Sequence, residues 1–249
     1  MRVLSVLHPG GGHSGVLGER VRAAGHEIVE WNPGAGEDMP GPLGAFDALA
    51  VFGGGQNLRD AGRLPWMGAE IELIREALAG ELPVVGVCLG SQLLAAAAGA
   101  NVRRASTPEI GWYEVERTAA GAADPLFGAL PQRFSAYEWH SYAWELPRGA
   151  VELARSPVCG QAYRLGTAWG LTFHPEVTDD IVVAWGADYL EDPDAVALGI
   201  DPEAVTAEAL ERLPEWNRIG TLLFDGWVRA ASAAARERPA APAPPLPRG

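Results

Sequence analysis

Short apolar runs alternate with segments of helical spacing through the first hundred residues. The apolar runs cover residues 3–7, 27–31, 46–52 and 83–87, and the helical segments cover residues 16–24, 65–79 and 91–98. Strands that are apolar on both faces are typical of parallel sheets, because helices cover both sides of such a sheet. The alternation therefore predicts an α/β fold with a mostly parallel, twisted sheet flanked by helices.

The middle of the chain has a different pattern. Between Ile110 and Phe173 the apolar segments are short, aromatic and separated by turn residues; they cover residues 111–117, 134–140, 151–155, 161–165 and 168–173. This pattern is typical of antiparallel strands. We therefore expect antiparallel strands added to the parallel core.

Helical patterns return after Glu176. We expect helices over residues 179–190, 201–213 and 215–235. Asp201 is a suitable N-cap and Pro202 suits the first helical position, whereas Pro214 is expected to stop the helix that precedes it. Residues 236–249 are rich in Pro and Ala and are expected to form a disordered tail.

These segments suggest a single domain over residues 1–235. Its core would be residues 1–178, and its C-terminal helices would be residues 179–235. A chain of 249 residues with 48% hydrophobic residues has enough apolar side chains for such a domain.

The charged residues exclude several function classes. All 19 basic residues are arginine, so lysine-dependent chemistry such as a P-loop or a Schiff base is excluded. The formal net charge of −13 argues against nucleic acid or an anionic membrane as a partner. No apolar run is long enough for a signal peptide or a membrane span, and two cysteines cannot form a disulfide framework, so we expect a cytoplasmic protein.

The stretch Gly86-Val87-Cys88-Leu89-Gly90 lies between an apolar strand and a helix of small residues. This is the layout of a nucleophile elbow, with cysteine in place of serine. The two glycines leave room for the sharp turn, and the positive end of the following helix would stabilise a thiolate. A buried core cysteine is the alternative interpretation of Cys88 taken alone.

A base and an orienting acid are available 86 residues further on, in Phe173-His174-Pro175-Glu176. His174 would accept the thiol proton and return it to the leaving amine, and Glu176 would orient the imidazole. A hydrogen-bonded structural histidine is the alternative interpretation of His174. The zinc deaminase pattern also contains H-x-E, but it needs cysteines downstream, and both cysteines here lie upstream. We therefore predict no metal.

The elbow and the F-H-P-E motif together resemble class I (triad) glutamine amidotransferases, especially the stand-alone group similar to the glutaminase domain of GMP synthase. The resemblance covers residues 1–178. It implies a flavodoxin-like, mostly parallel sheet with flanking helices. It also implies that Cys88 forms a γ-glutamyl thioester, that His174 is the general base and that Glu176 is the third triad member.

The resemblance also implies further site residues. Gly54, at the end of a strand, and Leu89 would donate the backbone amides of an oxyanion hole. Gln92 would line the substrate pocket, although an exposed amide at the helix start is the alternative. Ser141 and Tyr142 stand where many relatives have Gly and Asp to hold the α-groups of the substrate. Because a tyrosine hydroxyl is a weaker acceptor than a carboxylate, this departure affects how free glutamine is recognised.

Several other polar residues receive structural interpretations. The loop from His8 to His13 is interpreted as a strand-to-helix connection, with an anion or metal loop as the alternative. His140 is interpreted as a packed core histidine, with a binding residue as the alternative. Cys159 is interpreted as an unreactive strand cysteine. Glu109 lies in a segment common in the family, and we assign it no role beyond strand entry.

Several functions remain open. A glutaminase would release ammonia for an acceptor reaction. Because the sequence has no ATP-binding signature, the synthetase that uses the ammonia would be a separate subunit. A hydrolase of γ-glutamyl amides or peptides would use the same triad without an acceptor. A catalytically silent binding protein would keep only the fold. A DJ-1-type hydrolase is disfavoured because Leu89 stands where that group commonly has histidine. None of these candidate functions requires a cofactor.

Overall fold

The computed structural model describes residues 1–188 and 192–237. The strands are β1 (Arg2–Val6), β2 (Glu27–Trp31), β3 (Ala48–Val51), β4 (Val84–Val87), β5 (Val102–Arg117), β6 (Arg133–Trp144), β7 (Val151–Arg155), β8 (Gly160–Leu165) and β9 (Ala168–Leu171). The α-helices are α1 (Gly15–Ala23), α2 (Pro65–Ala79), α3 (Leu89–Ala97), α4 (Ala119–Ala122), α5 (Asp179–Ala187), α6 (Pro193–Leu198) and α7 (Pro202–Glu237).

The strands of the described residues form a nine-stranded sheet in the order β2-β1-β3-β4-β9-β8-β7-β5-β6. The five strands from β2 to β9 are parallel, and the remaining pairings are antiparallel. The predicted fold class, a mostly parallel core with added antiparallel strands, is confirmed. One detail was wrong: β9 was expected to be purely antiparallel, but it pairs in parallel with β4 and antiparallel with β8, so it joins the two halves.

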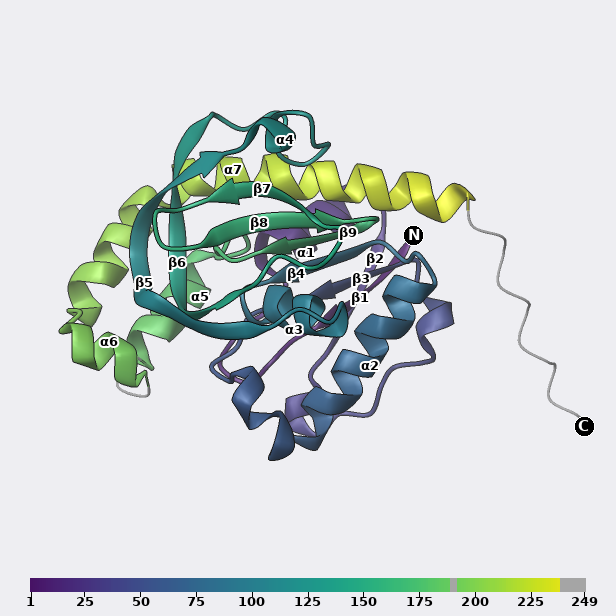
Figure 1. Ribbon diagram of the computed structural model, residues 1–249, viewed down its shortest axis with the longest axis horizontal. Helices are drawn as coiled ribbons and strands as arrows, with labels where there is room; N and C mark the ends of the chain where they lie inside the picture. The colour runs from purple at the N-terminus through teal and green to yellow at the C-terminus, as the bar shows by residue number, and fades with distance from the viewer. Residues whose placement is uncertain (189–191, 238–249) are drawn as a thin grey trace, which may run out of the picture.

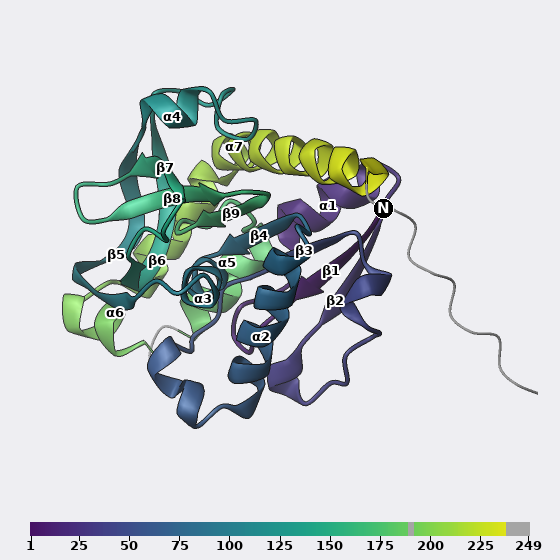
Figure 2. The same cartoon turned by 45° about the vertical axis from the view of Figure 1, so that its right-hand side comes forward.

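Helices cover both faces of the parallel half. Helices α2 and α3 lie in front of the sheet in Figures 1 and 2, whereas α1 and α7 lie behind it. The buried apolar residues form a separate cluster on each face. Leu17 of α1 and Trp216 of α7 belong to one, and Ile74 of α2 and Leu93 of α3 belong to the other. The near-continuous apolar strands are therefore explained by burial on both sides.

Two strands extend beyond the predicted segments. β5 begins at Val102, and its register with β6 shifts between Arg104 and Glu109, so an irregular, Pro-containing stretch lies inside the strand. β6 continues past His140 to Trp144. The segment predicted to hold the substrate's α-groups is therefore part of a strand.

The prediction that Pro214 stops a helix was wrong. A continuous helix, α7, runs from Pro202 to Glu237 with Pro214 inside it. Leu213 and Trp216, on either side of the proline, are both buried, so packing outweighs the hydrogen bond that the proline removes. The predicted start is confirmed, because the Asp201 carboxylate accepts hydrogen bonds from the first-turn amides of α7.

The remaining differences lie around the predicted helix over residues 179–190. α5 ends at Ala187, and the expected end at Leu190 lies outside the described residues. Helix α6 was not predicted, although Asp192 caps it and Pro193 is its first residue. Most of the predicted tail, residues 238–249, also lies outside the described residues. Across the described part of the chain, no helix is both long and apolar enough to cross a membrane.

Candidate active site

Cys88 lies at the turn between β4 and α3, with backbone angles φ of 51° and ψ of −110°. This is a region that residues with a Cβ rarely adopt. A Cβ on Gly86 would lie 2.5 Å from the carbonyl oxygen of Gly90, and a Cβ on Gly90 would lie 2.0 Å from that of Val51. Both glycines are therefore required by close backbone contacts, and the strained turn has the geometry expected of a nucleophile elbow.

The elbow is fixed to its neighbours by backbone hydrogen bonds. The Cys88 amide donates to the Leu171 carbonyl of β9 at 2.7 Å, and the Gly90 amide donates to the Phe52 carbonyl at 3.1 Å. The Sγ atom of Cys88 lies 3.7 Å from the Trp139 carbonyl oxygen of β6. The sulfur is thus held between the parallel core and the first antiparallel strand pair, at the N-terminus of α3.

His174 and Glu176 follow β9, and the structure brings them next to Cys88. The Nδ1 atom of His174 lies 2.8 Å from Oε1 of Glu176, and both side chains are almost fully buried. A Cβ on Gly53 would lie 3.0 Å from Cε1 of His174 and 3.5 Å from Cβ of Cys88. The imidazole and the cysteine therefore border the same small space beside Gly53. Sequence reasoning did not single out Gly53.

The surroundings of His174 favour its charged form. Burial alone would lower the pKa of His174, but the Glu176 carboxylate and the Cys88 sulfur outweigh it and raise that pKa well above its ordinary value. The Trp185 ring packs edge-on against the imidazole at 4.7 Å, and the Trp216 indole donates to the His174 carbonyl at 2.8 Å. A fixed imidazolium beside a sulfur can donate a proton to a leaving group.

Gly54 and Leu89 both line the pocket that contains Cys88. Leu89 is the first residue of α3, so its N–H has no carbonyl of a preceding turn to bind. Within residues 1–188 and 192–237, neither the Gly54 amide nor the Leu89 amide donates to a carbonyl oxygen outside the regular elements. Two such amides can stabilise a developing oxyanion.

The pocket has a volume of about 590 Å³ and is also lined by the three predicted substrate-binding residues, Gln92, Ser141 and Tyr142. Gln92 is buried rather than exposed, and its side-chain amide donates to the Tyr142 carbonyl at 3.2 Å. The alternative of an exposed helix-start amide was therefore wrong. Gln92 therefore connects α3 to β6 in the lining of the pocket.

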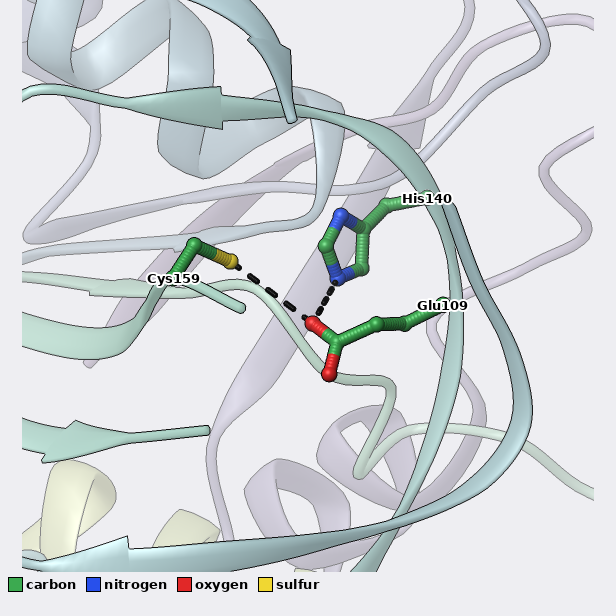
Figure 3. A group of neighbouring side chains, drawn as sticks. All are labelled: Glu109, His140 and Cys159. Atoms are coloured by element: carbon green, nitrogen blue, oxygen red, sulfur yellow. Dashed lines mark hydrogen bonds and ion pairs between the residues drawn. The ribbon is translucent and has the colours of Figure 1, made fainter. Parts of the chain in front are cut away.

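A buried polar cluster lies beside the pocket on β5 and β6 (Figure 3). Its centre is Oε2 of Glu109, which accepts a hydrogen bond from Nε2 of His140 at 3.0 Å. The same oxygen accepts hydrogen bonds from Gln161 at 2.9 Å and from Ser156 at 3.1 Å. His140 is buried, as predicted, and it also lines the pocket. Glu109, to which no role was assigned, therefore fixes the orientation of a pocket residue.

Cys159 also contacts this cluster. Its Sγ atom lies 3.7 Å from Glu109 Oε2, in the turn before β8 rather than in a strand as predicted. Burial, followed by the charge of Glu109, raises the pKa of the Cys159 thiol well above its ordinary value. The thiol is therefore held neutral, which agrees with the expectation that it is unreactive.

Glu109, His140 and Cys159 are also the residues best placed to hold a metal ion within the described part of the chain. Their ligand atoms lie within 4.8 Å of one another. Oε2 of Glu109 already accepts hydrogen bonds from His140 Nε2 and Cys159 Sγ. The other ring nitrogen of His140 hydrogen bonds to the Tyr142 carbonyl at 3.2 Å. The hydrogen bonds alone account for the arrangement, so it needs no ion to explain it.

His8 has a larger role than the predicted strand-to-helix connection. Its Nε2 atom lies 2.9 Å from a carboxylate oxygen of Glu70 on α2, and Nδ1 lies 3.1 Å from the Phe52 carbonyl. Both side chains are fully buried. A Cβ on Gly54 would lie 2.6 Å from the Cβ of His8, so the imidazole supports the chain at that glycine. The pairing joins distant segments and leaves no local sequence signal.

Comparison with known proteins bears on this arrangement. A family model described as "Glutamine amidotransferase class-I" matches residues 16–181, which is most of the chain. The chain belongs to the class I glutamine amidotransferase family. The predicted resemblance is thereby confirmed.

Individual proteins are similar to this chain over different lengths. The glutamine amidotransferase-like protein YfeJ of Salmonella typhimurium is 34% identical over 187 residues, covering 73% of this chain and 78% of that protein. A γ-glutamyl-L-1-hydroxyisopropylamide hydrolase of a Pseudomonas species is 31% identical over 147 residues, covering 55% of this chain and 49% of that protein. A crystal structure of a Thermotoga maritima glutamine amidotransferase is 28% identical, with a TM-score of 0.82, and covers 92% of this chain and 98% of that one.

Proposed function

We propose that this amidotransferase family member hydrolyses the side-chain amide of glutamine through a triad of Cys88, His174 and Glu176. The observation that supports this most strongly is the 2.8 Å contact between Glu176 and His174, because His174 lines the same pocket as a cysteine of strained backbone. A nucleophile, a base and an orienting acid in that order are the parts of a cysteine-based acyl transfer site.

The first half of the reaction forms a covalent intermediate. The Cys88 thiolate attacks the δ-carbon of glutamine, and the carbonyl oxygen becomes an oxyanion that accepts hydrogen bonds from the amides of Gly54 and Leu89. His174 then donates its proton to the amide nitrogen, the C–N bond breaks and ammonia leaves. A γ-glutamyl thioester remains on Cys88.

The second half releases the product. His174, now neutral, takes a proton from a water molecule, and the resulting hydroxide attacks the thioester carbon. The C–S bond breaks, which restores the thiolate and the imidazolium and frees glutamate. In this proposal Gln92, Ser141 and Tyr142 contact the substrate, no cofactor takes part, and the ammonia passes to a separate synthetase subunit in the cytoplasm.

A second candidate is hydrolysis of γ-glutamyl amides or peptides without an acceptor. The similarity to the Pseudomonas γ-glutamyl amide hydrolase favours it, because the same triad would cleave a substituted amide. The two candidates share the thioester and differ only in the leaving amine.

The test is to incubate the purified chain with L-glutamine and with a γ-glutamyl dipeptide, and to measure ammonia, free amino acid and glutamate. Glutamine turnover supports the first candidate, and dipeptide cleavage without glutamine turnover supports the second. Cys88→Ala should abolish either activity, whereas Cys159→Ser should retain it. Turnover that is unchanged in Cys88→Ala would refute the proposed nucleophile, and a chain inactive on both compounds would favour a binding role.

A further inference from the structure

Charged residues gather at one side of the pocket, where β5, β6 and α6 meet. Arg104 comes from β5, Ser141 and Tyr142 come from β6, and Asp194 comes from the first turn of α6; all four line the same pocket as Cys88. Figure 1 shows α6 beside the β5 and β6 ribbons. Neither Arg104 nor Asp194 belongs to the triad or to the oxyanion amides.

Arg104 and Asp194 form a two-pronged ion pair. Nη1 of Arg104 lies 3.0 Å from one carboxylate oxygen of Asp194, and Nη2 contacts the other oxygen. The pair remains accessible, with 46% of the Arg104 side chain and 20% of the Asp194 side chain exposed. A hydrogen bond from Arg104, then one from Ser141, lowers the pKa of Asp194, so its carboxylate is charged at neutral pH.

The spacing along β6 fits a glutamyl group. The Trp139 carbonyl lies 3.7 Å from the Cys88 sulfur. Ser141, which hydrogen bonds to Asp194, is two residues further along the strand, so its side chain lies on the same face as that of Trp139, about 7 Å further along β6. The δ-carbon and α-carbon of glutamine are separated by three bonds, roughly 4 Å when extended. A glutamyl chain of this length, attached to the sulfur and extended along β6, would direct its α-substituents toward Ser141 and the ion pair, which line the same pocket.

We propose that Arg104 and Asp194 bind the α-amino-acid end of the substrate, with Arg104 pairing to the α-carboxylate and Asp194 to the α-ammonium. This inference rests on the proposed amide hydrolysis and assigns substrate specificity to a site outside the triad. It also gives Ser141 and Tyr142 a role, because both lie beside the ion pair in the same pocket.

The neighbouring acid Asp192 is already engaged. It accepts a hydrogen bond from the Trp139 indole at 2.8 Å, and it caps α6 through the amides of Asp194 and Ala195. Asp192 therefore holds α6 against β6, which keeps Asp194 in place. The Tyr142 hydroxyl hydrogen bonds to Arg104 and steadies the other half of the pair.

The experiment compares the variants on L-glutamine and on two analogues that each lack one α-charge. The substrates are L-glutamine, glutaramate, which lacks the α-ammonium, and 4-aminobutanamide, which lacks the α-carboxylate. Asp194→Asn should lower kcat/KM roughly 10- to 100-fold for L-glutamine, mainly through KM, and should have little effect on glutaramate. Arg104→Gln should lower kcat/KM for L-glutamine by a similar factor and should have little effect on kcat/KM for 4-aminobutanamide.

The matched control is Arg103→Gln. Arg103 is the preceding residue of β5, its side chain is 72% exposed, and it pairs with Glu145 instead. This variant should leave all three substrates unchanged, because an exposed ion pair contributes little. Equal losses on all three substrates in Asp194→Asn would mean that the pair is merely structural, and unchanged kinetics on L-glutamine would also overturn the inference.

A binding measurement separates this inference from the proposed reaction. Titration calorimetry of L-glutamine into Cys88→Ala measures affinity without turnover, and adding Asp194→Asn should weaken that affinity roughly 10-fold or more. If the parent chain hydrolyses none of the amides, the proposed function fails while calorimetry still tests the ion pair. If Cys88→Ala does not bind L-glutamine, or if the double variant binds it equally well, the ion-pair inference fails.

Discussion

The strained backbone of Cys88 yields a stability prediction that does not depend on activity. At φ of 51° and ψ of −110°, a residue with a Cβ carries about 1–3 kcal/mol of strain. Cys88→Ala keeps the Cβ and its strain, whereas Cys88→Gly removes both. At an ordinary helical position, replacing alanine by glycine costs about 0.5–1 kcal/mol.

The backbone strain that glycine relieves at position 88 is partly offset, because removing a buried Cβ loses about 0.8 kcal/mol of hydrophobic stabilisation. Taking the middle of the strain range, the change from alanine to glycine should cost about 1 kcal/mol less at position 88 than at an unstrained helical site. Ala69 is a matched control site, because it is exposed and lies inside α2.

The assay is equilibrium urea unfolding of Cys88→Ala, Cys88→Gly, the parent chain and Ala69→Gly. The difference between the two Cys88 variants is compared with the difference between the parent chain and Ala69→Gly. We expect Ala69→Gly to be destabilised and Cys88→Gly to be at least as stable as Cys88→Ala. An equal or larger loss for glycine at position 88 would refute the strain argument, and with it the structural basis of the elbow.

Three further predictions concern the site and its supports. Glu176→Gln removes the carboxylate that contributes most to raising the pKa of His174, so the fall of kcat/KM at alkaline pH should begin at a lower pH than in the parent chain. The activity should also be reduced about 10²–10⁴-fold. A pH profile that does not shift would contradict this prediction. Glu138 is a fully buried residue of β6. Burial, then the charge of Glu109, raises the pKa of Glu138 well above 4.5, so its stabilising contribution is present below pH 4.5 and is lost as pH rises. The melting temperature of Glu138→Gln relative to the parent chain should therefore increase from pH 5 to pH 8. Gly90→Ala should unfold the chain or sharply lower its melting temperature, because the new Cβ would lie 2.0 Å from a carbonyl oxygen. Gly68→Ala, in open space inside α2, should instead stabilise the chain by about 1 kcal/mol. Similar melting temperatures for these two variants would contradict the close contact at Gly90.

The parts of the site that sequence reasoning found are encoded locally. The glycines around Cys88 and the spacing of His174 and Glu176 are visible in short stretches of sequence, and the structure brings those stretches together at the ends of β4 and β9. The parallel strands were found because burial on both faces leaves a near-continuous apolar run.

The parts that were missed depend on contacts between distant segments. His8 pairs with Glu70 across 62 residues, and Arg104 pairs with Asp194 across 90 residues. Neither pair has a spacing rule that a single sequence can reveal. The continuation of α7 through Pro214 is a tertiary effect as well, because it depends on what the helix packs against.

The most direct test of the proposed chemistry is to look for the covalent intermediate on Cys88. The chain is mixed with L-glutamine, quenched in acid and examined by intact-protein and peptide mass spectrometry. The predicted result is one γ-glutamyl group on the peptide that contains Cys88, present in Cys159→Ser and absent from Cys88→Ala. A γ-glutamyl group on Cys159, or ammonia released at the parental rate by Cys88→Ala, would contradict it.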